Sequence, residues 1–349
     1  MRSMSTGLGD IEVRKIQLTG GSTYTVSLPK NWVEKMDLKP RDGVKVDWRP
    51  SGALRIYPID MHETQQRVIT IDAESLPKES LHDHLMGAYI SGAEMIKIVY
   101  DPIYERNHRK EIRRFLRNTR GFEIVNESES RVEILSLINA GEMPINSSIN
   151  RMYSQLNSLI RDIITALEER DLDLISDADE RESEVDALLY LIERQVSVAL
   201  ESHVVANALK IGRTQAVEYS NLARTLERMM DHALQISILI HTSKPGDIET
   251  NSAPFTQLPV WQEAIKQLMI NIRTRNSHQI EEARFNLKDA QNTLVEHEDK
   301  LMSSSQKKKN SLLEFRISES VRRLCAYARD FGEILLNIKM YDETITKDK

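Results

Sequence analysis

The sequence is poor in cysteine and in aromatic residues. Its 349 residues include a single cysteine, Cys325, which excludes an internal disulfide and fits a reducing cytoplasm. Aromatic residues make up only 5% of the chain, whereas hydrophobic residues as a whole make up 40%. With 29% charged residues, this composition favours a helix-rich protein whose cores are packed by aliphatic side chains.

Long apolar runs are also missing. No segment approaches the roughly 20 apolar residues that a membrane helix needs, so membrane insertion is not expected. The N-terminal sequence MRSMSTGLGDIEVRK lacks the apolar segment of a secretory signal. We therefore expect a cytoplasmic location.

Common catalytic motifs are absent as well. The sequence has no GxSxG elbow, no Walker phosphate loop and no ordered serine, histidine and aspartate signal. A helical di-metal oxidase would use Glu-x-x-His pairs, and the histidines of the helical C-terminal part stand at other spacings. We therefore do not expect an enzyme.

Charge is distributed unevenly along the chain. The net charge is −6, yet residues 1–58 carry ten lysines and arginines against six acidic residues. A basic head on an acidic body is the asymmetry expected when only the head contacts a polyanion.

The head, residues 11–58, has the pattern of about four short strands and one helix. IEVRKIQL and TYTVSL alternate around a TGGS turn, and KNWVEKMDL follows Pro29 as a helix. VKVDWR and ALRIYP are two further strands. Because so short a segment cannot bury a sufficient core, we expect an interleaved homodimer.

These residues resemble the AbrB/SpoVT swapped-hairpin family of dimeric DNA-binding modules. VRKIQL, TGG, TVSLPKNW, DGVKVDW and LRIYP carry the resemblance. It implies that Arg14 and Lys15 form the basic pair of the first strand, and Lys30 and Arg41 are candidate phosphate contacts. Thr25 stands where many members have an arginine. The alternative is a module that only dimerises the protein.

Residues 64–138 predict a small α+β module with the order β-α-β-α-β-β. One of its helices is strongly basic, which is typical either of a face for an anionic partner or of a solvated helix surface. Its basic residues are Arg109, Lys110, Arg113, Arg114 and Arg117. The sequence assigns this module no role.

Residues 145–343 are helical throughout and repeat. Three amphipathic helices fill 145–243, a polar linker covers 244–258, and three more helices fill 258–343. The predicted core stripes are Ile149, Met152, Leu156, Ile160 and Ile164 in the first helix, and Val185, Leu189, Ile192 and Val196 in the second.

Two pairs of carboxylates interrupt these stripes. Glu182 and Asp186, like Glu227 and Asp231, are four residues apart and face the same way on their helices. If the helices are neighbours, the four acids share one patch, their pKa values rise, and a bound cation removes the repulsion. The alternative is a set of exposed ion pairs with Arg181, Arg224 and Arg228.

The helical repeat, with ExxVDxL at 182–188 and LERMMDHA at 226–233, resembles the PhoU family of phosphate-uptake regulators. The resemblance implies paired three-helix bundles and metal sites at Glu182, Asp186, Glu227 and Asp231. Iron, zinc, manganese and magnesium all stay open as the metal. It also implies a phosphate transporter or its signalling components as partner. In the second repeat Arg322 and Ala326 replace the acids.

The expected fold is multidomain: a small β-rich swapped-hairpin head, an α+β module and an all-α body of two three-helix bundles. Two functions follow. One is a phosphate-homeostasis regulator that binds DNA through its head. The other is a metal-containing dimer that regulates a phosphate transporter by protein contact alone.

Overall fold

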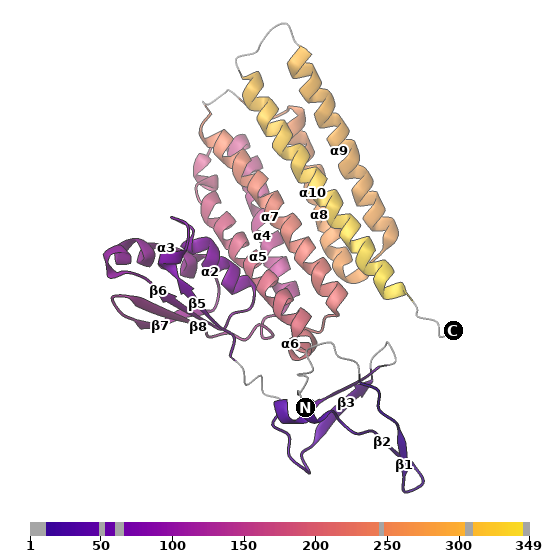
Figure 1. The fold of residues 1–349 in the computed structure, drawn as a ribbon. Helices are drawn as coiled ribbons and strands as arrows, with labels where there is room; N and C mark the ends of the chain where they lie inside the picture. The colour runs from indigo at the N-terminus through magenta and orange to yellow at the C-terminus, as the bar shows by residue number, and fades with distance from the viewer. Residues whose placement is uncertain (1–11, 49–52, 60–65, 244–247, 304–309, 345–349) are drawn as a thin grey trace. The chain divides into compact units, whose positions relative to one another are not determined.

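The computed structural model describes residues 12–48, 53–59, 66–243, 248–303 and 310–344 (Figure 1). The chain divides into two compact units, Met1–Gln66 and Arg67–Lys349. The first unit holds the β-rich head, and the second holds the α+β module together with the helical body. The multidomain layout expected from the sequence is confirmed.

The first unit consists of two antiparallel hairpins and a short helix. Strand β1 (Gln17–Thr19) pairs with β2 (Thr23–Thr25), and β3 (Val44–Trp48) pairs with β4 (Leu54–Pro58). Helix α1 (Lys30–Lys35) lies between the hairpins in sequence.

Two details of the head differ from the sequence prediction. The first strand begins at Gln17, so Arg14 and Lys15 precede it and do not lie on it. Helix α1 ends at Lys35, two residues before Asp37, whose φ of 49° is in the left-handed region that a helix cannot continue through. Between β1 and β2, Gly20 and Gly21 adopt positive φ, which explains the TGG turn.

The β3–β4 hairpin has one apolar face. Val46 is paired with Ile56, and Val44 with Pro58, so these side chains lie on the same side of the two strands. Leu54, at the other end of β4, shares that side. Val46 and Leu54 are 56% and 65% exposed, and none of the described side chains of the first unit is buried.

The α+β module is a four-stranded sheet in the order β5-β6-β8-β7. Strands β5 (Val68–Asp72) and β6 (Met95–Val99) are parallel and joined by α2 (Leu81–Ile90). Helix α3 (Glu105–Asn118) leads to the antiparallel pair β7 (Phe122–Glu127) and β8 (Arg131–Ser136). The predicted order of strands and helices is confirmed.

The helical body has two sets of three long helices, as the repeat predicted (Figure 1). The first set is α4 (Ile145–Glu169), α5 (Ala178–Glu201) and α7 (Arg213–His241), with the short α6 (His203–Ala208) before α7. The second set is α8 (Ala253–Thr274), α9 (Ser277–Ser303) and α10 (Ser311–Glu343). Helices α7 and α10 pack together, and one continuous apolar core runs through both sets.

The predicted core stripes are confirmed except at one end. All four stripe residues of α5 are buried, and so are the first four of α4, whereas Ile163 takes the buried place expected for Ile164. The linker prediction was wrong at its C-terminal end, because α8 begins at Ala253 and contains Pro259. Phe255 and Leu258 are buried in the core, so packing favours helix N-terminal to that proline.

Among the described residues, no helix is both long enough and apolar enough to cross a membrane.

Candidate metal centre

The four carboxylates lie on two helices that pack against one another. Glu182 and Asp186 are on α5, and Glu227 and Asp231 are on α7. Buried neighbours in sequence, among them Val185 on α5, fix which side of each helix faces the core. The carboxylates therefore stand at the edge of the first bundle's core, where Asp231 is exposed and the other three are partly buried.

The pKa values of all four groups are raised, and carboxylates of the set contribute to the shift at Glu182, Asp186 and Glu227. Burial is the main cause at every position. Burial, with Glu182 and Asp231 nearby, raises the pKa of Asp186 to about 7. Burial, Asp231 and Asp186 likewise raise the pKa of Glu227 to about 7, against the opposing effect of two arginines. The pKa of Glu182 is raised by burial and then by Asp231 across the helix interface. Asp231 on α7 thus acts on both acids of α5, so the two pairs lie on adjoining faces of the packed helices.

The alternative of local ion pairs is not what the structure shows for α5. Arg181 turns away from the neighbouring Glu182. Its Nη1 lies 2.6 Å from Asp162 Oδ2 on α4, and its Nε lies 2.9 Å from Asp177 Oδ1. This guanidinium is thus shared by two carboxylates outside the patch.

The arginines of α7 are also engaged elsewhere. Arg224 forms an ion pair with Glu193 of α5, and the guanidinium of Arg228 lies 5.6 Å from the ring centroid of Tyr327 on α10. Within the described parts of the chain, no ion pair involves any of the four patch carboxylates. Arg224 and Arg228 therefore lower the pKa of Glu227, and Arg228 that of Asp231, without forming an ion pair with either acid.

The side chains as they stand do not form a closed ligand set. In the portion of the chain that the structure describes, no three histidine, cysteine, aspartate or glutamate side chains are grouped closely enough to hold a metal ion. The donor chemistry nevertheless fits a hard cation, since it consists of carboxylate oxygens that repel one another.

Sequence reasoning missed Tyr190, which adjoins the patch. It lies one turn after Asp186 on α5 and packs against the apolar core of the α+β module. Burial raises the pKa of its phenol to about 12, with a further contribution from Asp186 and Glu227. The spacing of 182, 186 and 190 at every fourth residue is the signal that points to it.

In the second bundle, Arg322 and Ala326 stand at the motif positions that hold acids in the first. Arg322 of α10 instead forms an ion pair with Glu298 of α9, and the hydroxyl of Ser318 donates a hydrogen bond to the same carboxylate at 3.1 Å.

The basic residues predicted to contact DNA are spread over the head. Arg14 forms an ion pair with Glu12, and Lys30 Nζ lies 3.5 Å from Glu34 Oε1 on the same helix. Lys15 and Arg41 are exposed. Two of the four basic residues predicted to contact DNA, Arg14 and Lys30, are therefore already paired with glutamates of the head.

Comparison with known families identifies two domains. The family model of the PhoU domain matches residues 149–240, which contain all four patch carboxylates. The model described as "Antidote-toxin recognition MazE, bacterial antitoxin" matches residues 17–64, a range that begins after Arg14 and Lys15. No curated protein matches the chain. Both resemblances found in the sequence are thereby confirmed, for a PhoU domain and for an N-terminal domain of the MazE/AbrB type.

Proposed function

We propose that this chain, with its PhoU domain and its N-terminal MazE/AbrB-like domain, is a regulator of phosphate homeostasis. PhoU is a regulatory domain family, and the match covers the bundle that holds the carboxylate patch. We assign no catalysis to it. Its partner is a phosphate transporter or a signalling component of one, and its head acts as a dimeric, DNA-binding module.

The carboxylate patch is the proposed sensor, and it works by holding a cation. Four acids with raised pKa values and no ion-pair partner in the described chain are costly to ionise together. A bound Fe, Zn, Mn or Mg ion would stabilise them in their charged form. Glu182, Asp186, Glu227 and Asp231 are the proposed ligands.

Metal analysis of the protein purified without chelator tests this proposal. We expect Glu227→Gln combined with Asp231→Asn to remove most of the bound metal while leaving helix content unchanged by circular dichroism. Glu218→Gln on the same helix is the matched control, and it should keep the metal. Unchanged metal in the double variant would show that the patch is not the site.

The head is proposed to dimerise through the apolar face of β3–β4. Val46 and Leu54 are more than half exposed, and the described side chains of the first unit include no buried one. A second copy of the chain is the partner that this face fits, because a module of this size needs a partner's strands to complete its core. Two copies would then present their basic residues around one two-fold axis.

Duplex binding by the intact protein tests the DNA part of the proposal. We expect measurable affinity at low salt that falls steeply as salt is raised, because phosphate contacts release counterions. Arg14→Ala with Lys15→Ala should weaken it, whereas Lys35→Ala should have a smaller effect. A chain that binds no duplex at low salt would leave only the transporter role.

One observation favours that second function, a dimeric regulator that acts by protein contact alone. The guanidinium of Arg14 and the ammonium of Lys30 are each paired with a glutamate of the head. A basic side chain that is already paired with a glutamate contributes less to the binding of a polyanion such as DNA. The binding experiment above separates the two functions.

A further inference from the structure

We propose that the exposed face of α3 in the α+β module is a contact surface for the phosphate backbone of duplex DNA. This surface, which we call the α3 stripe, consists of Arg106, Lys110, Arg113 and Arg117. The inference rests on the proposed DNA-binding function but concerns a different part of the chain. It assigns a role to a module for which the sequence offered none.

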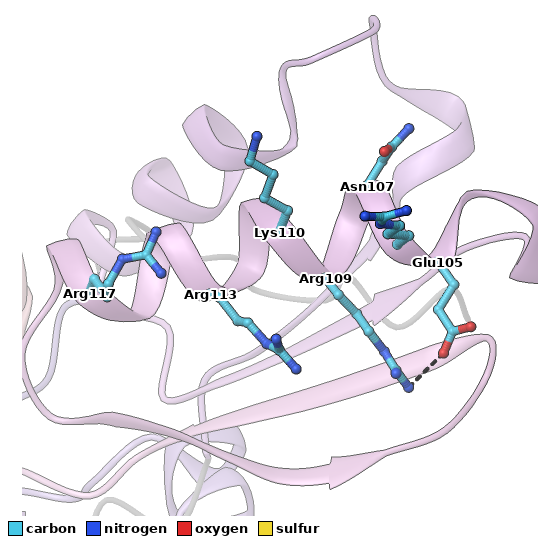
Figure 2. Close-up of a pocket in the computed structure, with 7 residues that line it drawn as sticks. Glu105, Asn107, Arg109, Lys110, Arg113 and Arg117 are labelled. Carbon is cyan, nitrogen blue, oxygen red and sulfur yellow. Dashed lines mark ion pairs between the residues drawn. The ribbon is translucent and has the colours of Figure 1, made fainter.

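Helix α3 separates its charges from its apolar residues. Ile112 and Phe115 are buried against the sheet, and the four residues of the stripe are exposed. They line a shallow hollow of about 750 Å³ together with Glu105, Asn107 and Arg109. Figure 2 shows the long side chains of Lys110, Arg113 and Arg117 extending away from the helix.

The charges of the stripe are not neutralised by the protein. Arg109 is the exception within the hollow, because its guanidinium lies 2.6 Å from Glu105 (Figure 2). It also lies 2.9 Å from Glu127. In the described residues, no ion pair involves any member of the stripe. Four cations held on one helix repel one another, and an anionic partner would remove that repulsion.

The lining favours a phosphate backbone over other anions. Three of the four stripe residues are arginines, whose planar guanidinium groups donate paired hydrogen bonds to phosphate oxygens. No lining residue is aromatic, so stacked bases of a single strand have no platform here. The apolar side of α3 is buried in the module, so the helix has no apolar face to insert into a lipid surface.

The length of the stripe also fits a duplex. Arg106 and Arg117 are eleven residues apart, which is about 16 Å along a helix at 1.5 Å per residue. Over that distance duplex DNA presents on the order of ten phosphate charges, one for each 1.7 Å of its axis. Such a contact adds affinity and positions the protein without reading bases.

Salt-dependent duplex binding by paired variants of the full chain tests the proposal. The stripe variant is Lys110→Gln with Arg113→Gln. The matched control is Arg114→Gln with Arg120→Gln, which removes two exposed charges of the same module from outside the hollow. We expect the stripe variant to reduce the slope of log affinity against log salt by about 1.8, which is 0.9 for each lost phosphate contact. The control should change the slope by less than half of that.

Repeating the measurement in the Arg14→Ala, Lys15→Ala background separates this inference from the proposed role of the head. If the stripe variant lowers the slope in both backgrounds, the α3 contact is supported, even where the head variant itself has no effect. Equal slopes for the stripe variant and its control would overturn it. So would a stripe variant that loses binding to vesicles of anionic lipid or to polyglutamate while keeping its full affinity for the duplex.

Discussion

Arg322 and Glu298 form an ion pair between α10 and α9 in the second bundle, with Arg322 Nε 3.1 Å from Oε1 and 3.2 Å from Oε2 of the carboxylate. Glu298 is buried, and the hydroxyl of Ser318 donates a third hydrogen bond to it. The four patch acids of the first bundle differ from Glu298 in this respect. The second bundle neutralises a buried carboxylate internally, and the first leaves four carboxylates without such a partner.

The ion pair of the second bundle gives a stability prediction. Arg322→Met leaves the carboxylate of Glu298 buried without its cation, and we expect the free energy of unfolding to fall by about 3 kcal/mol. Urea unfolding measures this loss. Arg323→Met, which removes an exposed arginine next in sequence, is the control and should change stability by less than about 0.5 kcal/mol. A similar small loss for both variants would mean that Glu298 is solvated in solution.

The patch of the first bundle predicts an unusual dependence of stability on pH in metal-free protein. The unfolded chain ionises its aspartates and glutamates near pH 4. In the folded protein the pKa values of Asp186 and Glu227 are raised to about 7. The folded state therefore binds these protons more tightly, so their contribution to stability declines as pH rises from about 4 to about 7.

Thermal unfolding of metal-free protein between pH 5 and pH 8 checks this sign. Asp186→Asn with Glu227→Gln should flatten the decline, because the substituted amides have no proton to lose. Glu218→Gln should reproduce the slope of the unaltered protein. If the unaltered protein and the double variant lose stability in parallel, the two carboxyls ionise normally and the patch is more open than the structure indicates.

The helical body was predictable from sequence because its amphipathic stripes are long. Val185 and Leu189, like Ile149 and Met152, repeat at helical spacing over many turns, and all four are buried. The start of α8 was not predictable, because a proline such as Pro259 is usually found in the first turn of a helix and not in its interior. Only the tertiary burial of residues before it extends the helix.

The candidate site was predictable in its acids but not in its surroundings. The four-residue spacing of the carboxylates determines that each pair faces one way. The partner of a neighbouring arginine depends on which helices pack together, and sequence does not show this. Arg181 reaches Asp162 on another helix, and Arg224 reaches Glu193. These pairs hold Arg181 and Arg224 on carboxylates outside the patch, although Arg224 still lowers the pKa of Glu227.

If the protein dimerises through the apolar face of the β3–β4 hairpin, as proposed, its oligomeric state should depend on Val46. A charge on this face would be buried between two copies, so Val46→Asp should shift the protein from dimer to monomer at micromolar concentration. Lys45→Glu, on the opposite face of the same strand, is the control and should leave the dimer intact. Light scattering after size-exclusion chromatography measures both. A dimer that survives Val46→Asp must be held by another surface.

Arg194 of α5 connects the helical body to the α+β module, so its substitution should weaken the attachment of the module. This arginine is 4% exposed, and its Nη1 donates hydrogen bonds to the carbonyl oxygens of Tyr89 at 2.7 Å and Ala93 at 2.8 Å. The guanidinium also lies about 5 Å from the ring centroids of Tyr89 and Phe122. Arg194→Met would keep the packing of the side-chain stem but would leave two buried carbonyls without a donor.

We expect Arg194→Met to lower the free energy of the opening that exposes α2 by about 3 kcal/mol, the value of two hydrogen bonds to a charged donor. Native-state hydrogen exchange measures this at the amides of α2 and β6. Arg194→Lys restores a cation but not the planar fork, so it should recover part of the protection. Tyr190 lies one turn before Arg194 and beside the carboxylate patch. Loosening that reached the patch would therefore also weaken the metal binding proposed for it, whereas loosening confined to the module would leave that binding unchanged.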